Sequence, residues 1–436
     1  MKRVLFILLL TIPYIGFGQV WEKIFDFYYS SDGMDVKQTS DGGYILIGNW
    51  WDGGQLEDDI VLIKTNNQGD TTWTKILSSV GEQRVFSIEV TNDGGYIIGG
   101  YEEDSTLSGD LWVIKTDSIG NIEWDKNFGD NKWDGGSFVK QLNDNNYLIT
   151  GYDNVYSLPN GDDIWELFVV KLDTLGNTLW YQTYYDSTYI RMEGRGVVEN
   201  TDNEYIILGI NHLNYGIHTS IIKIDSLGNQ TDYQIYSESS NFHSMNAIKK
   251  TNDHHYVVTG NTEVINSGNY FVQTILSKID SLGNIVWTQN YGGNESGGND
   301  VEQTNDGGYI ITGYKTVNDS TDLWLIKTDS LGVIEWETTF GGVGEDIGSS
   351  IEQTNDGGYI ICGSTQYFDG GYHIYLIKTD DNGNVTSTIE IPKPLSNRKL
   401  DKVIDLLGRE TKPQKNTPFI EIYDDGSTEK KLIIEK

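Results

Sequence analysis

The chain has 436 residues, with 31 Lys and Arg against 64 Asp and Glu, so its formal net charge is −33. This charge disfavours nucleic acids and anionic membrane surfaces as partners, since both repel acidic proteins. Aromatic residues make up 12% of the chain, which argues against a disordered acidic protein. The single cysteine, Cys362, excludes an intramolecular disulfide, and its apolar surroundings in the sequence predict a buried thiol.

Residues 1–18 are typical of a secretory signal peptide. Lys2 and Arg3 precede a mostly apolar stretch over residues 4–15, and small residues surround the expected cleavage point before Gln19. The stretch is short for a membrane span, so we expect no integral membrane segment once the signal is removed. An N-terminal membrane anchor is the alternative interpretation.

Residues 19–391 contain one unit repeated seven times at intervals of 50 to 58 residues. The phrase Thr-Asn-Asp-Gly-Gly-Tyr stands at residues 304–309 and again at 354–359, and its tyrosine recurs at positions 44, 96, 147, 205, 256, 309 and 359. A lysine from a second recurring phrase also appears once in each unit, at positions 64, 115, 171, 223, 278, 327 and 378. Each unit is predicted to form four short strands, joined by Gly-containing turns that suit hairpins.

Seven four-stranded units of about 50 residues predict an all-β fold, a seven-bladed β-propeller. Residues 21–25 resemble a fourth strand with no unit before it, and the seventh unit lacks the Trp that marks a fourth strand. We therefore expect an N-terminal strand to complete the seventh blade and close the ring. Such closure would remove exposed edge strands.

The repeat resembles known propeller families to different degrees. Over residues 20–391 the chain resembles the "DGGY" propeller repeats of secreted bacterial proteins. The spacing from Gly120 to Trp124 partly resembles the tryptophan-docking motif of quinoprotein propellers, but Asp117 lies one residue too close. The Asp-box of sialidase propellers shares the turn but not the spacing. These departures weaken any transfer of enzymatic function.

The C-terminus is predicted to hold a linker over residues 392–400 and a small β-sandwich-like domain over 401–436, where apolar alternation flanks a Gly turn. The segments DLLGRE (405–410), IYDDGS (422–427) and KKLIIEK (430–436) resemble the C-terminal sorting domain of type IX secretion cargo in Bacteroidota. This resemblance implies the type IX machinery as a partner. It also implies a secreted or outer cell-surface location, after the signal peptide and the tail are processed. A β appendage without a sorting role is the alternative.

Residues that recur in every unit are expected to be structural. The recurring Tyr and Trp side chains should pack between blades, and the recurring lysines should pair with turn aspartates such as Asp306 and Asp356. Function is expected where the units differ. If the first strand of each unit is innermost, the variable loops between second and third strands share one face with the connections between units, and the tight turns lie on the other.

The variable loops supply the candidate ligand-binding residues. Aromatic side chains beside carboxylates suit stacking on sugar rings or contact with a protein partner. The candidates are Trp50, Trp51, Tyr156, Tyr215, Tyr367 and Tyr372. Aromatic side chains that merely pack the loops are the alternative.

The connections between units add Glu82, Glu295 and Glu345 at one equivalent position. If they approach the ring axis, these glutamates could bind Ca²⁺, although no cofactor is certain. No catalytic set stands out from the sequence. The leading hypothesis is a non-enzymatic secreted or cell-surface binding module for a glycan or protein, with a role in adhesion. The alternatives are a propeller hydrolase or lyase acting on extracellular polysaccharide, and a purely structural envelope component.

Overall fold

The computed structural model of the chain divides into two compact units, Met1–Ser387 and Thr388–Lys436. The structure describes residues 20–27, 29–51, 53, 58–78, 81–103, 109–129, 132–157, 163–200, 204–213, 216–236, 243–266, 269–293, 295–318, 320–366, 370–385, 400–405, 412, 419–423 and 428–431. The predicted signal peptide and nearly all of the predicted linker lie outside these residues. The described residues contain no helix, and none of their segments qualifies as a helical membrane span.

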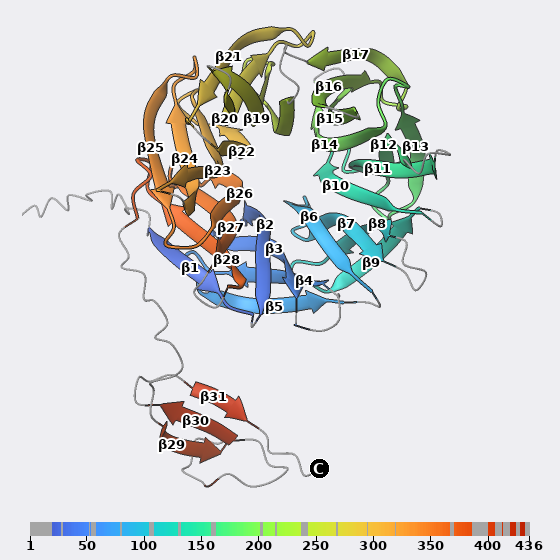
Figure 1. Ribbon diagram of the computed structural model, residues 1–436. Helices are drawn as coiled ribbons and strands as arrows, with labels where there is room; N and C mark the ends of the chain where they lie inside the picture. The colour runs from blue at the N-terminus through green and yellow to red at the C-terminus, as the bar shows by residue number, and fades with distance from the viewer. Residues whose placement is uncertain are drawn as a thin grey trace, which may run out of the picture. The chain divides into compact units, whose positions relative to one another are not determined.

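The first unit consists of antiparallel sheets whose strands follow one another around an axis (Figure 1). The first three sheets are β2 (Ser30–Gln38) to β5 (Thr71–Leu77), with β3 (Tyr44–Trp51) and β4 (Asp58–Thr65); β6 (Gln83–Val90) to β9 (Ile122–Phe128), with β7 (Tyr96–Glu103) and β8 (Gly109–Thr116); and β10 (Asp134–Gln141) to β13 (Thr178–Tyr184), with β11 (Tyr147–Ser157) and β12 (Asp163–Leu172). The next three are β14 (Arg191–Glu199) to β17 (Gln230–Tyr236), with β15 (Tyr205–Leu213) and β16 (Gly216–Ile224); β18 (His243–Lys250) to β21 (Ile285–Tyr291), with β19 (Tyr256–Asn266) and β20 (Asn269–Ile279); and β22 (Ser296–Gln303) to β25 (Ile334–Phe340), with β23 (Tyr309–Val317) and β24 (Ser320–Thr328). The last comprises β26 (Asp346–Gln353), β27 (Tyr359–Gln366), β28 (Tyr372–Thr379) and β1 (Trp21–Phe25).

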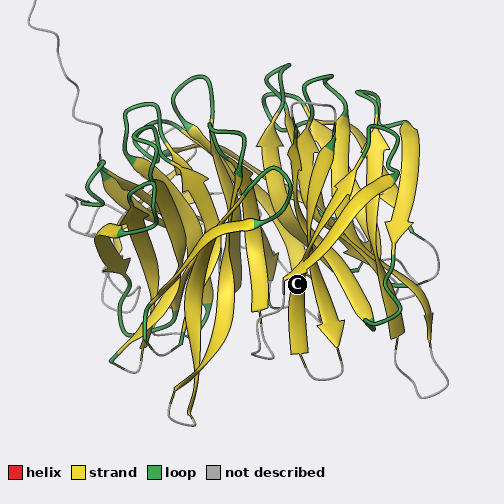
Figure 2. Ribbon diagram, turned by 90° about the horizontal axis from the view of Figure 1, so that it is seen from above, coloured by secondary structure: helices red, strands yellow, loops and turns green. Residues whose placement is uncertain are grey.

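This arrangement is a β-propeller, as the sequence predicts. Among the described residues, β1 to β28 form seven groups of four strands, and a single parallel bridge between Trp165 and Arg191 joins the third and fourth groups. The strands run between two faces of the ring, with connections at both faces (Figure 2). We call the face with the tight hairpin turns the turn face and the opposite one the loop face.

The N-terminal strand closes the ring, which confirms the expectation from the sequence. β1 pairs antiparallel with β28, so that Trp21 lies opposite Lys378 and Phe25 opposite Ile374. Trp21 therefore supplies the Trp that the seventh repeat lacks. Its ring packs against Tyr44 of the first sheet, with the ring centroids 5.8 Å apart.

The recurring aromatic residues pack between neighbouring sheets, also as predicted. Trp73 of β5 contacts Tyr96 of β7, which belongs to the next sheet, at a centroid distance of 6.4 Å. The same contact recurs in Trp124–Tyr147, Trp287–Tyr309 and Trp336–Tyr359. The surrounding apolar clusters likewise mix residues of adjacent sheets, such as Ile47 and Ile98. The core is thus divided into layers between the sheets, each stabilised by apolar burial.

The recurring lysine and the Asp-Gly-Gly turn form one interlocked contact. Lys64 of β4 is buried, and its Nζ lies 2.9 Å from Asp41 Oδ2 in the turn between β2 and β3. Gly42 has a φ of +81°, and a Cβ on Gly43 would collide with the carbonyl oxygen of Thr65. The equivalent pairs are Lys115–Asp93, Lys171–Asp144, Lys278–Asp253, Lys327–Asp306 and Lys378–Asp356. The predicted lysine–aspartate pairing is therefore confirmed at these positions.

The second unit contains one antiparallel sheet of three described strands, β29 (Leu400–Asp405), β30 (Phe419–Tyr423) and β31 (Thr428–Lys431). Its described residues do not include the second sheet that a sandwich would need. Most residues of the DLLGRE, IYDDGS and KKLIIEK segments lie outside the described residues. The sorting role of this unit therefore stays a prediction.

Candidate functional site

The innermost strand of every sheet carries a β-bulge at the same position of the repeat. In β2 the register shifts between Gly33 and Asp35, so that Met34 is the extra residue. A bulge re-aims the side chain of the extra residue. The seven bulge residues are Met34, Phe86, Ser137, Arg195, Asn246, Asn299 and Ser349, and all of them line a cavity on the ring axis.

The axial cavity has a volume of about 910 Å³ and is lined by the seven innermost strands. It extends to Asn143 and Asn252 in two of the tight turns, so it lies toward the turn face. Its wall differs from sheet to sheet. At one equivalent position, three residues after the bulge, the innermost strands carry Lys37, Glu89, Lys140, Val198, Lys249, Glu302 and Glu352.

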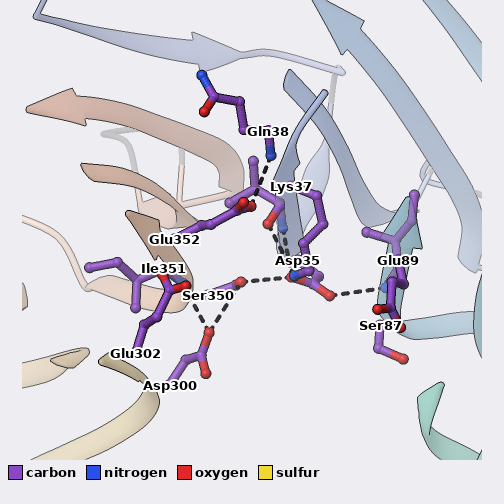
Figure 3. Close-up of polar contacts among 12 residues, drawn as sticks. Asp35, Lys37, Gln38, Ser87, Glu89, Asp300, Glu302, Ser350, Ile351 and Glu352 are labelled. Carbon is purple, nitrogen blue, oxygen red and sulfur yellow. Dashed lines mark hydrogen bonds and ion pairs between the residues drawn. The ribbon is translucent and has the colours of Figure 1, made fainter. Parts of the chain in front are cut away.

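Hydrogen bonds between neighbouring innermost strands hold this wall together (Figure 3). Ser350 Oγ donates to Asp35 Oδ1 at 2.7 Å, and the Ile88 N–H donates to Asp35 Oδ2 at 2.9 Å. The same Asp35 carboxylate forms an ion pair with Lys37. Burial would lower the pKa of Lys37, but the nearby carboxylates of Asp35 and Glu352 raise it, so the lysine is charged. Asp35 thus connects three strands of the wall.

Glu302 of the wall and Glu352, at the equivalent position of the last sheet, accept backbone N–H groups from the next innermost strand. The Gln353 N–H donates to Glu302 Oε2 at 2.6 Å, and the Gln38 N–H donates to Glu352 Oε2 at 2.8 Å. Burial, opposed by the charge of Lys249 and by the Gln353 hydrogen bond, raises the pKa of Glu302 to about 7. Burial also raises the pKa of Glu352. The ionised forms of Glu302 and Glu352 are therefore held at a cost in free energy.

The basic side chains of the wall belong mainly to the third, fourth and fifth sheets. Lys140 Nζ donates to Glu89 Oε1 at 2.6 Å, and Lys249 Nζ lies 3.5 Å from Asp300 Oδ1. Lys250 Nζ donates to a backbone oxygen, that of Glu199, at 3.1 Å. Residues 19–391 hold 19 basic and 56 acidic side chains, and five of each line the cavity. The cavity is thus formally neutral inside a strongly acidic body.

On the loop face, the structure separates the two predicted tryptophans. Trp50 packs inward: its Nε1 donates to the Phe27 carbonyl at 2.7 Å, and its ring contacts the Phe27 ring. Trp51 points the other way and is 40% exposed. Its ring lies beside that of Tyr29, which is 49% exposed, with the ring centroids 5.8 Å apart. Trp50 is thus half-buried and bonded to Phe27, whereas Trp51 offers an exposed ring; ligand binding by either stays a prediction.

Ring closure places Tyr372 next to this exposed pair. The Tyr372 N–H donates to Ser30 Oγ at 3.3 Å, which joins the last sheet to the first, and Tyr372 Oη donates to Glu345 Oε2 at 2.5 Å. We call Tyr29, Trp51, Glu345 and Tyr372 the loop-face patch. The backbone of Tyr156 pairs with Ile164 within β11 and β12. Tyr215 and Tyr367 lie outside the described residues.

The three predicted calcium ligands lie just before the innermost strands of three different sheets. Glu82 accepts a hydrogen bond of 2.8 Å from Tyr101 Oη of its own sheet, and the Glu295 carbonyl accepts one from the Thr316 N–H. Glu345 is bound to Tyr372, as described above. Within the described part of the chain, no three His, Cys, Asp or Glu side chains form a group that could hold a metal ion. The geometry therefore does not gather these glutamates into the Ca²⁺ site that the sequence suggests.

The charged wall of the cavity was missed by the sequence interpretation, which placed function in the loops. A signal for it exists in the repeat. The position occupied by Lys37 in the first unit changes sign or polarity from unit to unit, although it lies only two residues before a recurring Thr. Such variation within an otherwise repeated phrase marks a position where the contacts between neighbouring innermost strands differ around the ring.

Comparisons with known proteins identify the fold alone. No family model matches the chain, and no curated protein matches its sequence. An ulvan lyase, a polysaccharide lyase bound to a GlcA(1-4)Rha3S saccharide, is similar with a TM-score of 0.52 at 9% identity, over 84% of this chain and 98% of the lyase. A puromycin hydrolase has a TM-score of 0.50 at 10% identity, over 90% of this chain and 58% of the hydrolase. A Dyadobacter fermentans protein of unknown function has a TM-score of 0.49 at 10% identity, over 82% and 97% of the two chains.

Proposed function

We propose that this chain is an exported β-propeller that binds an extracellular glycan or protein through its loop face, without catalysing a reaction. The loop-face patch carries the proposal. It brings two exposed aromatic rings, those of Tyr29 and Trp51, next to the hydroxyl and carboxylate of Tyr372 and Glu345, on either side of the ring closure.

The chemistry of the patch favours a sugar over a featureless protein surface. The faces of aromatic rings pack well against the C–H faces of sugars, and the polar edges of Tyr and Glu can hydrogen-bond hydroxyl groups. A neutral glycan also avoids the repulsion that the acidic body exerts on anions. Patches that combine a few aromatic residues with polar neighbours are typical of binding surfaces.

Export rests on the two ends of the chain. Residues 1–18 have the composition of a signal peptide, and residues 401–436 resemble a type IX sorting domain. We therefore propose that the type IX machinery delivers the protein to the medium or to the outer cell surface. Deleting residues 401–436 should leave the protein in the periplasm. A truncated protein that still reaches the surface would exclude this role for the tail.

A glycan array probed with the purified protein tests the binding proposal. We expect a specific hit that Trp51→Ala abolishes, because the exposed ring provides the stacking surface. Tyr185→Ala is the matched control, since Tyr185 is also an aromatic residue that is 40% exposed. Loss of the hit in both variants, or in neither, would contradict the role of the patch. Shortened sugars after incubation would favour the alternative, a hydrolase or lyase.

A further inference from the structure

The axial cavity holds two charges of opposite sign whose ion pairs are not completed by the described residues. Glu302 uses one carboxylate oxygen for the Gln353 N–H and makes no ion pair with a described residue, since its neighbour Lys249 is paired with Asp300. On the adjacent innermost strand, Lys250 donates only to the backbone oxygen of Glu199 among the described residues. Both side chains line the cavity.

The size and lining of the cavity suit a small organic ligand. Its volume of about 910 Å³ lies within the range that is usual for small-molecule sites. The first three sheets contribute the apolar side chains Met34, Phe86 and Phe138 to the wall, and the fifth and sixth sheets contribute charges of both signs. A ligand that fits this wall has an apolar part and both a cationic and an anionic group.

The negative charge of residues 19–391 disfavours cavity ligands with a large net charge. Acidic residues outnumber basic ones about three to one in residues 19–391, but the cavity wall is formally neutral. An anion is repelled by the outer surface, and a cation is attracted to the many carboxylates outside the cavity. A zwitterion has no net charge, so the outer surface neither repels nor attracts it strongly. Its two charged groups can pair with Glu302 and Lys250 within the cavity.

We propose that the axial cavity is a binding site for a short zwitterionic peptide. Its ammonium group pairs with Glu302 and its carboxylate with Lys250, while an apolar side chain faces Met34, Phe86 and Phe138. The ammonium also relieves the cost of ionising the buried Glu302. This site is separate from the loop-face patch, because it lies toward the turn face, and it does not depend on glycan binding.

Calorimetric titration of the full-length purified protein with the tripeptide Ala-Phe-Ala tests the proposal. The peptide with free termini should bind. Acetylating its N-terminus or amidating its C-terminus should each weaken binding about tenfold or more, since each removes a charged contact. Absence of binding by the free peptide, or equal binding by all forms, would overturn the proposal.

Two variants assign the ends of the peptide. In Glu302→Gln, N-acetylation should no longer weaken binding, and in Lys250→Met, C-amidation should no longer do so, because the lost partners are then absent. Lys126→Met is the control, since Lys126 is exposed on β9. This variant should bind the tripeptide with the same affinity as the native protein. Penalties that persist in the first two variants would place the termini elsewhere. The comparison of free and blocked peptides uses the native protein, so it still tests the proposal if a variant does not fold.

Binding of the tripeptide should also be unchanged in Trp51→Ala. A loss of peptide binding in Trp51→Ala would mean that the peptide occupies the loop-face patch, which would overturn the assignment to the cavity. A protein that binds the peptide but no glycan would leave the cavity proposal intact and contradict only the proposed function.

Discussion

The contacts between neighbouring sheets repeat around the ring, whereas the wall of the axial cavity does not. Between the sheets, a Trp–Tyr contact and a Lys–Asp pair recur from one unit to the next. On the innermost strands, the same repeat places lysine, glutamate, serine, arginine or phenylalanine at equivalent positions. The recurring residues satisfy a requirement shared by all units, the packing of sheet on sheet. The varying residues do not share that requirement, and several of them, such as Glu302, instead bond the next innermost strand.

Two glutamates on innermost strands, of which only Glu302 lines the cavity, show how far these strands depart from repetition. Glu193 of β14 is buried between Arg191 and Arg195, with Arg195 Nη2 at 2.8 Å and His212 Nε2 at 3.4 Å. Burial alone would raise the pKa of Glu193, but His212 and the two arginines lower it to about 2. Around Glu302 the charge of Lys249 and the Gln353 N–H only partly offset burial, and the pKa of Glu302 rises to about 7. One residue type is thus stabilised as an anion in one sheet and destabilised in another.

The largest effect is expected when the repeated packing is broken at the ring closure. Trp21 is 6% exposed and packs against Tyr44 across the closure. Trp21→Ala should lower the free energy of unfolding by about 3–5 kcal/mol, the usual cost of such a truncation. Guanidinium denaturation followed by circular dichroism measures it. Trp124→Ala removes the equivalent contact within the ring and is the reference. A cost below about 1 kcal/mol for Trp21→Ala would show that the N-terminal strand does not hold the ring.

A smaller effect is expected from Glu193→Gln. Because the pKa of Glu193 is lowered from 4.5 to about 2, its ionised form stabilises the native protein above pH 4.5, and this stabilisation is lost as the pH falls toward 2. The substitution should therefore destabilise the protein by about 3 kcal/mol at pH 7 and by nothing near pH 2. Unfolding curves between these pH values measure the difference. A difference that stays constant with pH would mean that the carboxylate charge is not responsible.

Glu302→Gln should have the smallest effect and the opposite sign. The pKa of Glu302 is raised from 4.5 to about 7, so the native state binds the proton more tightly than the unfolded state, and stability falls as the pH rises from 4.5 to 7. Above pH 7 the glutamine variant should be more stable than the native protein by about 2 kcal/mol, a value reduced for contact with cavity water.

The groups that face Glu302, namely Lys249, Asp300 and Glu352, are the same in both proteins, so the comparison isolates the one carboxyl. Thermal unfolding at pH 4.5 and pH 8 provides the measurement. Equal stability of the two proteins at pH 8 would show that the native carboxyl is not strained.

The repeat made the fold predictable from the sequence, because sheet packing imposes the same residues on every unit. The spacing of the tyrosines, the orphan strand at Trp21 and the lysine–aspartate pairs all predicted contacts that the structure contains. The buried state of Cys362 was also predicted and is confirmed, with the side chain fully buried between the first and last sheets.

The candidate site was less predictable, for two physical reasons. First, β3 extends to Trp51, so Trp50 and Trp51 alternate across a strand instead of sharing a loop, and Trp51 is exposed while Trp50 is half-buried. Second, the hydrogen bonds of the cavity wall join residues of different units, such as Ser350 and Asp35. Contacts of this kind depend on how neighbouring sheets are rotated and bulged, which no single unit reveals.

The pairing of β1 with β28 also constrains when the protein can finish folding. Tyr375 Oη donates to Glu22 across 353 residues of chain, so the first strand cannot find its partner until the last repeat has left the ribosome. Closing a flexible loop of that length would cost about 5 kcal/mol in entropy, whereas a preassembled arc of sheets lowers the cost by holding its ends near each other. The nascent chain therefore forms an open arc of sheets, with an unpaired edge strand at each end. Premature termination anywhere before residue 379 would leave both ends available for pairing with other chains.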